Sequence, residues 1–293
     1  MSNLIKRVFD RGARDLFYCK YSLAQKGILK NPSWENIEVN FIISTGRTGT
    51  RYLAELFNPL EGITALHEPD PDFLKLGIGF SKEAIEHFNA RSMIVAERRL
   101  VLKSLYENGS TVYIESNNRL FSLISVLVDI FPKCRIIHII RDGRDIVRSG
   151  MSRFWYREDD LFPRLKATDF PDDPYCDRWD ELDRFEKICW WWPKKDGIIH
   201  DGVEKYKNNC MTVKFEDIFD YDNNNPGLRK IVNFFELDSN IKLNRPKEKK
   251  SNETKEYQMP HWKDWESDLK EKFMEIAGDY MVRHNYLKDG EQW

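Results

Sequence analysis

Five short apolar runs, spaced along the chain from residue 39 onward, constrain the fold of this 293-residue sequence more than any other feature. They are rich in β-branched residues, and the central ones lack the alternation of polar and apolar side chains that a half-exposed strand shows. Runs of this kind suit strands that are covered on both faces, as in a parallel sheet. The predicted strands are residues 39–45, 63–66, 111–115, 135–140 and 210–215.

Helical patterns fall between and after these runs. They cover residues 50–57, 81–108, 120–131, 145–151, 182–206, 228–235 and 269–286. Strands that alternate with helices predict the α/β class, here a three-layer, doubly wound fold with a mostly parallel central sheet of about five strands, as in P-loop NTPases. We expect a single domain over residues 39–293, preceded by an N-terminal helical extension over residues 1–38. Long loops are expected near residues 154–183 and 245–264, and loops of that length are commonly functional.

The charged side chains nearly cancel, with 46 Lys plus Arg against 48 Asp plus Glu and a formal net charge of −2. This balance argues against a nucleic-acid binder, whose domain would be strongly basic. No run reaches the roughly 18–20 apolar residues of a membrane span, and the first residues lack the apolar stretch of a secretory signal. The five cysteines are scattered without Cys-x-x-Cys spacing, so we expect no disulfide framework, no zinc site and a cytoplasmic location.

A turn rich in glycine follows the first predicted strand and leads into a predicted helix. It reads Gly46-Arg47-Thr48-Gly49-Thr50, and Arg51 and Tyr52 come next. Glycines let backbone N–H groups approach an anion, and a helix N-terminus adds partial positive charge there. Arg47 would add a full cation. The turn therefore favours phosphate binding over an ordinary strand-to-helix turn with an exposed arginine. It is not a Walker A loop, because no lysine follows Gly49, and this argues against the interpretation as a magnesium-dependent ATPase.

A second cationic stretch follows the fourth predicted strand. Arg141 stands where that strand ends, at the sheet edge where ligands of open α/β sheets bind, and Ser149 comes eight residues later. Arg141, Arg144 and Arg148 could together grip a second phosphate. The alternative is surface ion pairing with Asp142 and Asp145, which suits Arg144 and Arg148 better than Arg141.

Together, the two motifs resemble those of sulfotransferases that use 3′-phosphoadenosine 5′-phosphosulfate (PAPS). The turn at Gly46–Thr50 is similar to the family's 5′-phosphosulfate loop, with Gly46 in place of the usual proline. The resemblance implies that Arg141 and Ser149 bind the 3′-phosphate and that Tyr52 takes the place of a tryptophan that stacks on adenine. It implies adenosine 3′,5′-bisphosphate as product and no metal. Lys249, Lys250 and Lys255 lie where relatives place a basic loop, although the family's Arg-Lys-Gly triplet is missing.

Sulfuryl transfer to a hydroxyl requires a general base. The histidine that many relatives place after a middle strand is absent, because that stretch reads Glu115-Ser116-Asn117. Other relatives place a glutamate soon after the first helix, where this chain has His67 and Glu68. We therefore predict Glu68 as the base, with Arg47 stabilising the leaving phosphate. His67 and Glu115 are the remaining candidates, and Glu68 could instead be a loop carboxylate paired with Arg47 or Arg51.

Five of the nine tryptophans lie between Trp155 and Trp192. We expect most of them in the core and one or two in an acceptor pocket for a small molecule, a carbohydrate or a lipid. The sequence does not indicate which acceptor it is, nor an oligomeric state. The competing interpretations are a P-loop-like small-molecule kinase and a non-catalytic nucleotide-binding module.

Overall fold

The computed structural model describes residues 37–238, 259–288 and 290. Its centre is a five-stranded sheet in the order β2-β3-β1-β4-β5, and every neighbouring pair is parallel. The prediction of a parallel sheet of about five strands is confirmed, since each predicted apolar run forms one strand. The strands are β1 (Glu38–Ser44), β2 (Ile63–His67), β3 (Val112–Ser116), β4 (Arg135–Ile140) and β5 (Cys210–Lys214).

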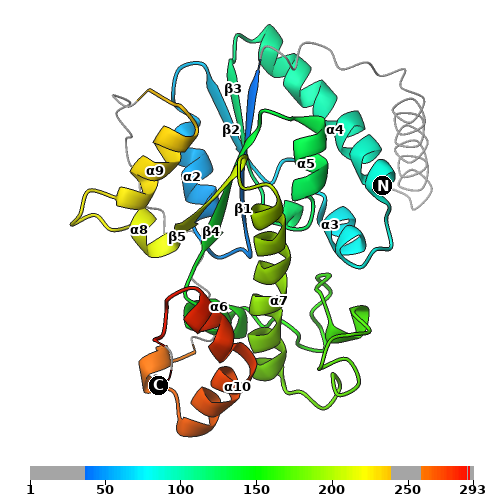
Figure 1. Cartoon of the computed structure of the whole chain (residues 1–293), viewed down its shortest axis with the longest axis vertical. Helices are drawn as coiled ribbons and strands as arrows, with labels where there is room; N and C mark the ends of the chain where they lie inside the picture. Colours follow the sequence, from blue (N-terminus) through cyan, green and yellow to red (C-terminus); the bar gives the residue numbers. More distant parts are fainter. Residues whose placement is uncertain (1–36, 239–258, 289, 291–293) are drawn as a thin grey trace, which may run out of the picture.

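Helices cover both faces of the sheet, which confirms the three-layer architecture (Figure 1). On one face lie α2 (Thr50–Phe57), α8 (Phe215–Ile218) and α9 (Pro226–Phe234). On the other lie α4 (His87–Glu107), α5 (Ile124–Ile130) and α7 (Arg184–Lys205).

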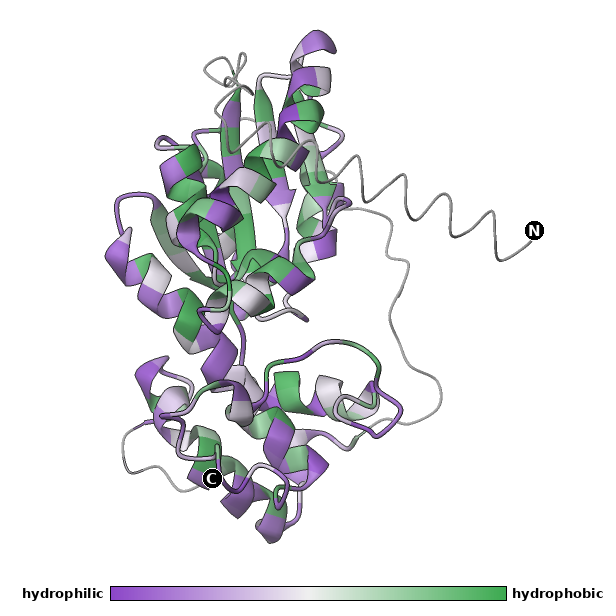
Figure 2. Ribbon diagram, turned by 90° about the vertical axis from the view of Figure 1, so that its right-hand side faces the viewer, coloured by the Kyte–Doolittle hydropathy of each residue, from purple (hydrophilic) through white to green (hydrophobic). Residues whose placement is uncertain are grey.

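Strand β1 shows why both faces must be covered. Its residues Phe41 and Ile43 are buried against the α4, α5 and α7 layer, whereas Ile42 is buried against the α2, α8 and α9 layer. Side chains alternate between the two faces of a strand, so a continuous apolar run has no solvent-facing side. Figure 2 shows the result, with hydrophobic strands inside and hydrophilic residues toward the outside.

Helices α6 (Gly143–Ser152) and α10 (Ser267–Arg283) lie beyond the carboxyl ends of the strands, beside the far end of α7 (Figure 1). Aromatic side chains fill this region. Trp155 packs edge-on against Trp191 at 4.8 Å between ring centroids, and Trp192 packs against Tyr280 at 5.4 Å. The buried apolar cluster is continuous from the sheet to α10.

Two predicted helices differ from the structure. The segment predicted as one helix over 81–108 is helical only from His87, as α4, because the backbone turns at Glu83 with a positive φ of 57°. Helix α3 (Leu74–Ser81), which precedes this turn, was not predicted. The helix predicted from residue 120 begins at Ile124, after a short 3-10 helix at Asn118–Leu120. Residues 154–183 form turns and loops around one 3-10 helix, Ala167–Asp169.

Several other expectations depend on residues that the structure does not fully describe. The helical extension over 1–38 lies outside the described residues apart from its last two positions, and Lys249, Lys250 and Lys255 lie outside them as well. In the described part of the chain, the cysteines Cys134, Cys176, Cys189 and Cys210 are free. No helix described here is long and apolar enough to cross a membrane.

Candidate functional site

A cavity of about 680 Å³ opens at the carboxyl ends of the strands. Its walls come from the loops after β1, β2, β3 and β4, from residues 162–165 of the long loop, and from α7. Most of the predicted site residues line it. They are Gly46, Arg47, Gly49, Thr50, Arg51, Tyr52, His67, Glu68 and Arg141. The topology therefore brings together residues that the sequence places up to 95 positions apart, counted from Gly46 to Arg141.

The turn after β1 has the strained backbone that its glycines allow. The backbone angle φ is 102° at Gly46, 63° at Arg47 and 74° at Gly49, and residues other than glycine seldom adopt such positive values. A Cβ on Gly49 would also lie 2.7 Å from Cζ of Phe219. Glycine is thus required at position 49 for two reasons, its backbone conformation and the packing of a neighbouring ring.

Thr48 and Ser44 brace this turn from the inside. The hydroxyl of Thr48 donates to Ser44 Oγ at 2.7 Å, and the N–H of Gly46 donates to the same oxygen at 3.0 Å. Thr48 is fully buried. Its hydroxyl therefore holds the turn in shape, and Thr48 is not among the residues that line the cavity.

The N-terminus of α2 faces the cavity. The helix begins at Thr50, and Gly49 at its N-cap offers no side-chain acceptor for the first N–H groups. Helix α6 differs, because the Asp142 carboxylate accepts from the N–H of Arg144 at its N-terminus. The first turn of α2 thus keeps the partial positive charge that suits an external anion.

The two sequence motifs meet at Arg47. Its Nε donates to Ser149 Oγ at 3.0 Å, and its backbone oxygen accepts from Nη1 of Arg141 at 2.7 Å. Arg141 also pairs with Asp145 at 3.1 Å and stacks on Phe215, with Cζ 4.3 Å from the ring centroid. The Arg141 Nε is buried and has no hydrogen-bond partner within the described part of the chain.

The neighbouring arginines of the second motif have structural contacts. Arg144 pairs with Asp142 at 2.6 Å and stacks on Trp262, with Cζ 3.8 Å from the ring centroid. For Arg144, the structure therefore shows the ion pair that was the alternative to phosphate binding. Arg148 donates from Nε to the backbone oxygen of Met259 at 3.0 Å. Arg141 is thus the arginine of this motif that lines the cavity.

Like charges gather around Arg47. Burial, followed by the charges of Arg153 and Arg141, lowers the pKa of Arg47 to about 10. Arg153 ends α6 one turn after Ser149 and lines the cavity, although neither sequence motif includes it. Three guanidinium groups held close together repel one another, and an anion between them would relieve that repulsion.

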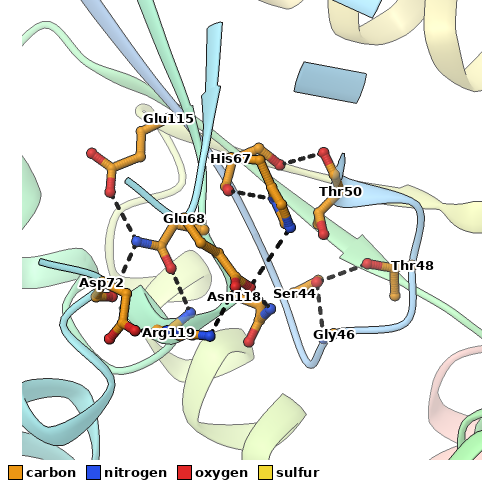
Figure 3. Close-up of polar contacts among 12 residues, drawn as sticks. Ser44, Gly46, Thr48, Thr50, His67, Glu68, Asp72, Glu115, Asn118 and Arg119 are labelled. Carbon is orange, nitrogen blue, oxygen red and sulfur yellow. Dashed lines mark hydrogen bonds and ion pairs between the residues drawn. The ribbon is translucent and has the colours of Figure 1, made fainter. Parts of the chain in front are cut away.

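Glu68 lies at the end of β2, and its carboxylate is bound on both oxygens (Figure 3). Oε1 accepts from Nδ2 of Asn118, and Oε2 pairs with Nη2 of Arg119 at 3.0 Å. The expected alternative partners, Arg47 and Arg51, are therefore replaced by Arg119. The side chain of Glu68 is 17% exposed and lines the cavity.

His67 stands beside Glu68, with Nε2 4.0 Å from Glu68 Oε1. Burial lowers the pKa of His67, whereas the charge of Glu68 acts in the opposite direction. The ring atom Nδ1 lies 3.1 Å from the backbone oxygen of Ser116, so in the neutral ring Nδ1 carries the proton and Nε2 holds the lone pair. Glu68 and His67 thus both offer a basic atom at the cavity.

Glu115, the third candidate base, is fully buried. Its oxygens accept from Nε and Nη2 of Arg98 at 2.8 Å each, from the hydroxyl of Tyr113 at 2.8 Å, and from Asn117 at 2.9 Å. Removing any of these partners would leave a buried charge uncompensated, which indicates a structural role, and Glu115 is not part of the cavity wall.

Besides Arg153, sequence reasoning missed other polar side chains in the cavity wall, among them Asn118, Arg119, Arg164 and Lys195. Asn118 and Arg119 follow the third predicted strand, and polar residues at a strand's carboxyl end were the available signal. Two of the clustered tryptophans, Trp155 and Trp191, line the cavity. The described residues contain no group of three or more His, Cys, Asp or Glu that could hold a metal ion.

No family model matches the sequence, and no curated protein matches it. Among the solved structures with a similar fold are three sulfotransferases. One is the sulfotransferase domain from the curacin biosynthetic pathway, which is 11% identical with a TM-score of 0.43, covering 69% of this chain and 74% of that one.

The second is a sulfotransferase from Alicyclobacillus acidocaldarius, which is 12% identical with a TM-score of 0.47, covering 84% of this chain and 94% of that one. The third is the sulfotransferase domain of the Synechococcus PCC 7002 olefin synthase, also 12% identical with a TM-score of 0.47, covering 86% and 97%. At such identities and TM-scores, the function has to be argued from the residues of the site.

Proposed function

We propose that this protein is a sulfotransferase that moves a sulfuryl group from PAPS to a hydroxyl or amine of a small-molecule, carbohydrate or lipid acceptor. The observation that carries the proposal is the meeting of the two motifs, with Arg47 Nε bound to Ser149 Oγ at 3.0 Å and its backbone oxygen bound to Arg141 at 2.7 Å. Two phosphate-binding motifs that converge on one cavity suit a nucleotide with two separated phosphate groups.

The residues present fit such a donor. The buried Nε of Arg141 lacks a partner among the described residues, and the first turn of α2 has no side-chain cap. Both are donors that an anion could satisfy, and unpaired buried donors are costly. The neighbouring cations Arg47 and Arg153 supply the charge that a phosphate needs.

We assign the chemical roles as follows. PAPS, when bound, supplies an activated sulfuryl group on a good leaving phosphate. Glu68 takes the proton of the acceptor as the new S–O bond forms, and the bond between sulfur and the bridging oxygen breaks with its electron pair going to the phosphate. Arg47 and the N–H groups of the turn stabilise the charge that develops there. Tyr52 lies in the cavity wall, and we assign it to the adenine.

The proposal includes a single domain over residues 39–293 and a cytoplasmic location. Calorimetry with adenosine 3′,5′-bisphosphate, compared with ATP plus Mg²⁺, tests it most directly. We expect metal-free binding of the bisphosphate, followed by transfer of label from ³⁵S-PAPS in a screen of sugar, phenol and lipid acceptors. A preference for ATP and Mg²⁺ would favour a kinase, and binding without transfer to any acceptor would favour a non-catalytic module.

A further inference from the structure

A buried lysine lines the cavity, and neither sequence motif contains it. Lys195 belongs to α7, and 5% of its surface is exposed. Its Nζ donates to the backbone oxygen of Thr45 at 3.0 Å and to Asn118 Oδ1 at 3.4 Å. Lysine is almost never buried to this extent unless it is paired. Both acceptors of Lys195 are uncharged oxygens, so its burial here needs an explanation.

The contact with Asn118 leads directly to Glu68. Asn118 accepts from Lys195 through Oδ1 and donates through Nδ2 to Oε1 of Glu68 (Figure 3 shows the second contact). An amide carries its acceptor and its donor on opposite branches. A donor at Oδ1 therefore fixes which branch faces Glu68. With the amide turned over, its oxygen would face a carboxylate oxygen, and Lys195 would face an NH₂ group.

Resting on the proposed function, we propose that Lys195 is a positioning residue of this site, which orients the Asn118 amide and, through it, the carboxylate of Glu68. The second contact of Lys195, with Thr45, ties the same ammonium to the start of the phosphate-binding turn. One side chain of α7 thus links the turn after β1 with the base at the end of β2.

The surroundings of Lys195 are consistent with a fixed side chain. Its Nζ lies 4.9 Å from the ring centroid of Phe121 and 5.1 Å from that of Trp191. Burial lowers the pKa of Lys195 to about 7, while the charge of Glu68 acts in the opposite direction. An amine keeps two N–H donors after it loses its proton, so both contacts persist in either protonation state.

The chain offers a matched control one residue away. Lys194, on the same helix, pairs with Asp173 at 3.1 Å and is 26% exposed. Replacing either lysine with methionine removes one ammonium from α7 while keeping an unbranched side chain. Lys195→Met should disturb the Asn118 amide, and Lys194→Met should leave it unchanged.

The first experiment needs no acceptor. Hydrogen exchange of the Asn118 side-chain amide is measured by NMR, with its signal assigned by its loss in Asn118→Ala. We expect slow exchange in the wild type and in Lys194→Met, and exchange at least about tenfold faster in Lys195→Met. Unchanged exchange in Lys195→Met would overturn the proposal. If Lys195→Met does not fold, Lys195→Ala is measured in the same way.

The second experiment reads catalysis through release of labelled sulfate from ³⁵S-PAPS, with water as acceptor. Because misplacing a catalytic group costs about 10²-fold, we expect Lys195→Met to lower the rate about 10²-fold, with the Kd for adenosine 3′,5′-bisphosphate within about threefold of wild type. The double variant with Asn118→Ala should lose no more than Asn118→Ala alone, since the two residues act in series. Losses that multiply would overturn the proposal. Failure of the wild type to bind the bisphosphate would instead refute the proposed function.

Discussion

Arg141 provides the sharpest test of how this cavity binds its ligand. Arg141→Met keeps a side chain that can pack on Phe215, but it removes the guanidinium and with it the buried Nε that lacks a partner in the described residues. If that nitrogen binds the 3′-phosphate, the variant loses one charge-assisted hydrogen bond to the ligand. Such a bond contributes about 1.5–3 kcal/mol, which corresponds to a loss of affinity of about 10- to 150-fold.

The assay is calorimetry with two ligands that differ only in the 3′-phosphate, adenosine 3′,5′-bisphosphate and adenosine 5′-phosphate. The loss should appear for the first ligand and be nearly absent for the second. Asp145→Asn is the matched control, because it breaks the ion pair with Arg141 while keeping the guanidinium. Its affinity for the bisphosphate should be retained or increased.

The same measurement can refute this reasoning. Arg141 also donates to the backbone oxygen of Arg47, so a purely structural role would loosen the phosphate-binding turn. Arg141→Met would then weaken both ligands equally. Equal losses for the two nucleotides would show that the 3′-phosphate does not contact Arg141.

Three further predictions concern the base, the turn and the acid stability of the fold. Glu68→Gln should lower the transfer rate about 10²- to 10⁴-fold with bisphosphate binding intact. Glu55→Gln, which removes another carboxylate from the cavity wall, should leave the transfer rate unchanged. A rate within a fewfold of wild type for Glu68→Gln would reject Glu68 as base. Gly49→Ala should cost about 2 kcal/mol of unfolding free energy and weaken nucleotide binding. The new Cβ would lie 2.7 Å from Phe219, and the backbone at this position has a φ of 74°. An unchanged melting temperature would contradict this prediction. Burial lowers the pKa of His284 from 6.5 to about 4, so the unfolded chain binds this proton first and stability falls as the pH drops from 6.5 toward 4. Between pH 7 and pH 5 the wild type should lose about 2 kcal/mol more unfolding free energy than His284→Gln. Parallel pH curves for the two proteins would count against this prediction.

Much of the fold could be read from the sequence because its signal is local. A strand buried on both faces must be apolar at every position, and this leaves short continuous runs that need no knowledge of the neighbouring elements. The same holds for the turn at Gly46–Thr50, where the need for positive φ selects glycine. Helix boundaries were less accurate: α4 begins only at His87, after a turn at Glu83 with a positive φ of 57° that the apolar pattern does not signal.

The roles of individual polar residues depended on tertiary contacts. Thr48 and Thr50 look alike in sequence, yet one hydroxyl braces the turn from inside while the other residue lines the cavity. Glu68 and Glu115 both end predicted strands, but only Glu68 reaches the cavity. The difference is Arg98, a residue of α4 that binds Glu115 inside the core.

The sequence by itself thus determined the parallel α/β architecture and the two motifs for which we propose anion binding, since both depend on residues that are adjacent in the chain. Only the tertiary structure decided that Arg47 and Ser149 touch, that Arg119 and Asn118 hold Glu68, and that Lys195 lies buried beside them. These contacts join segments from different strands and helices. Their energies depend on distance and burial, which the order of residues along one segment does not specify.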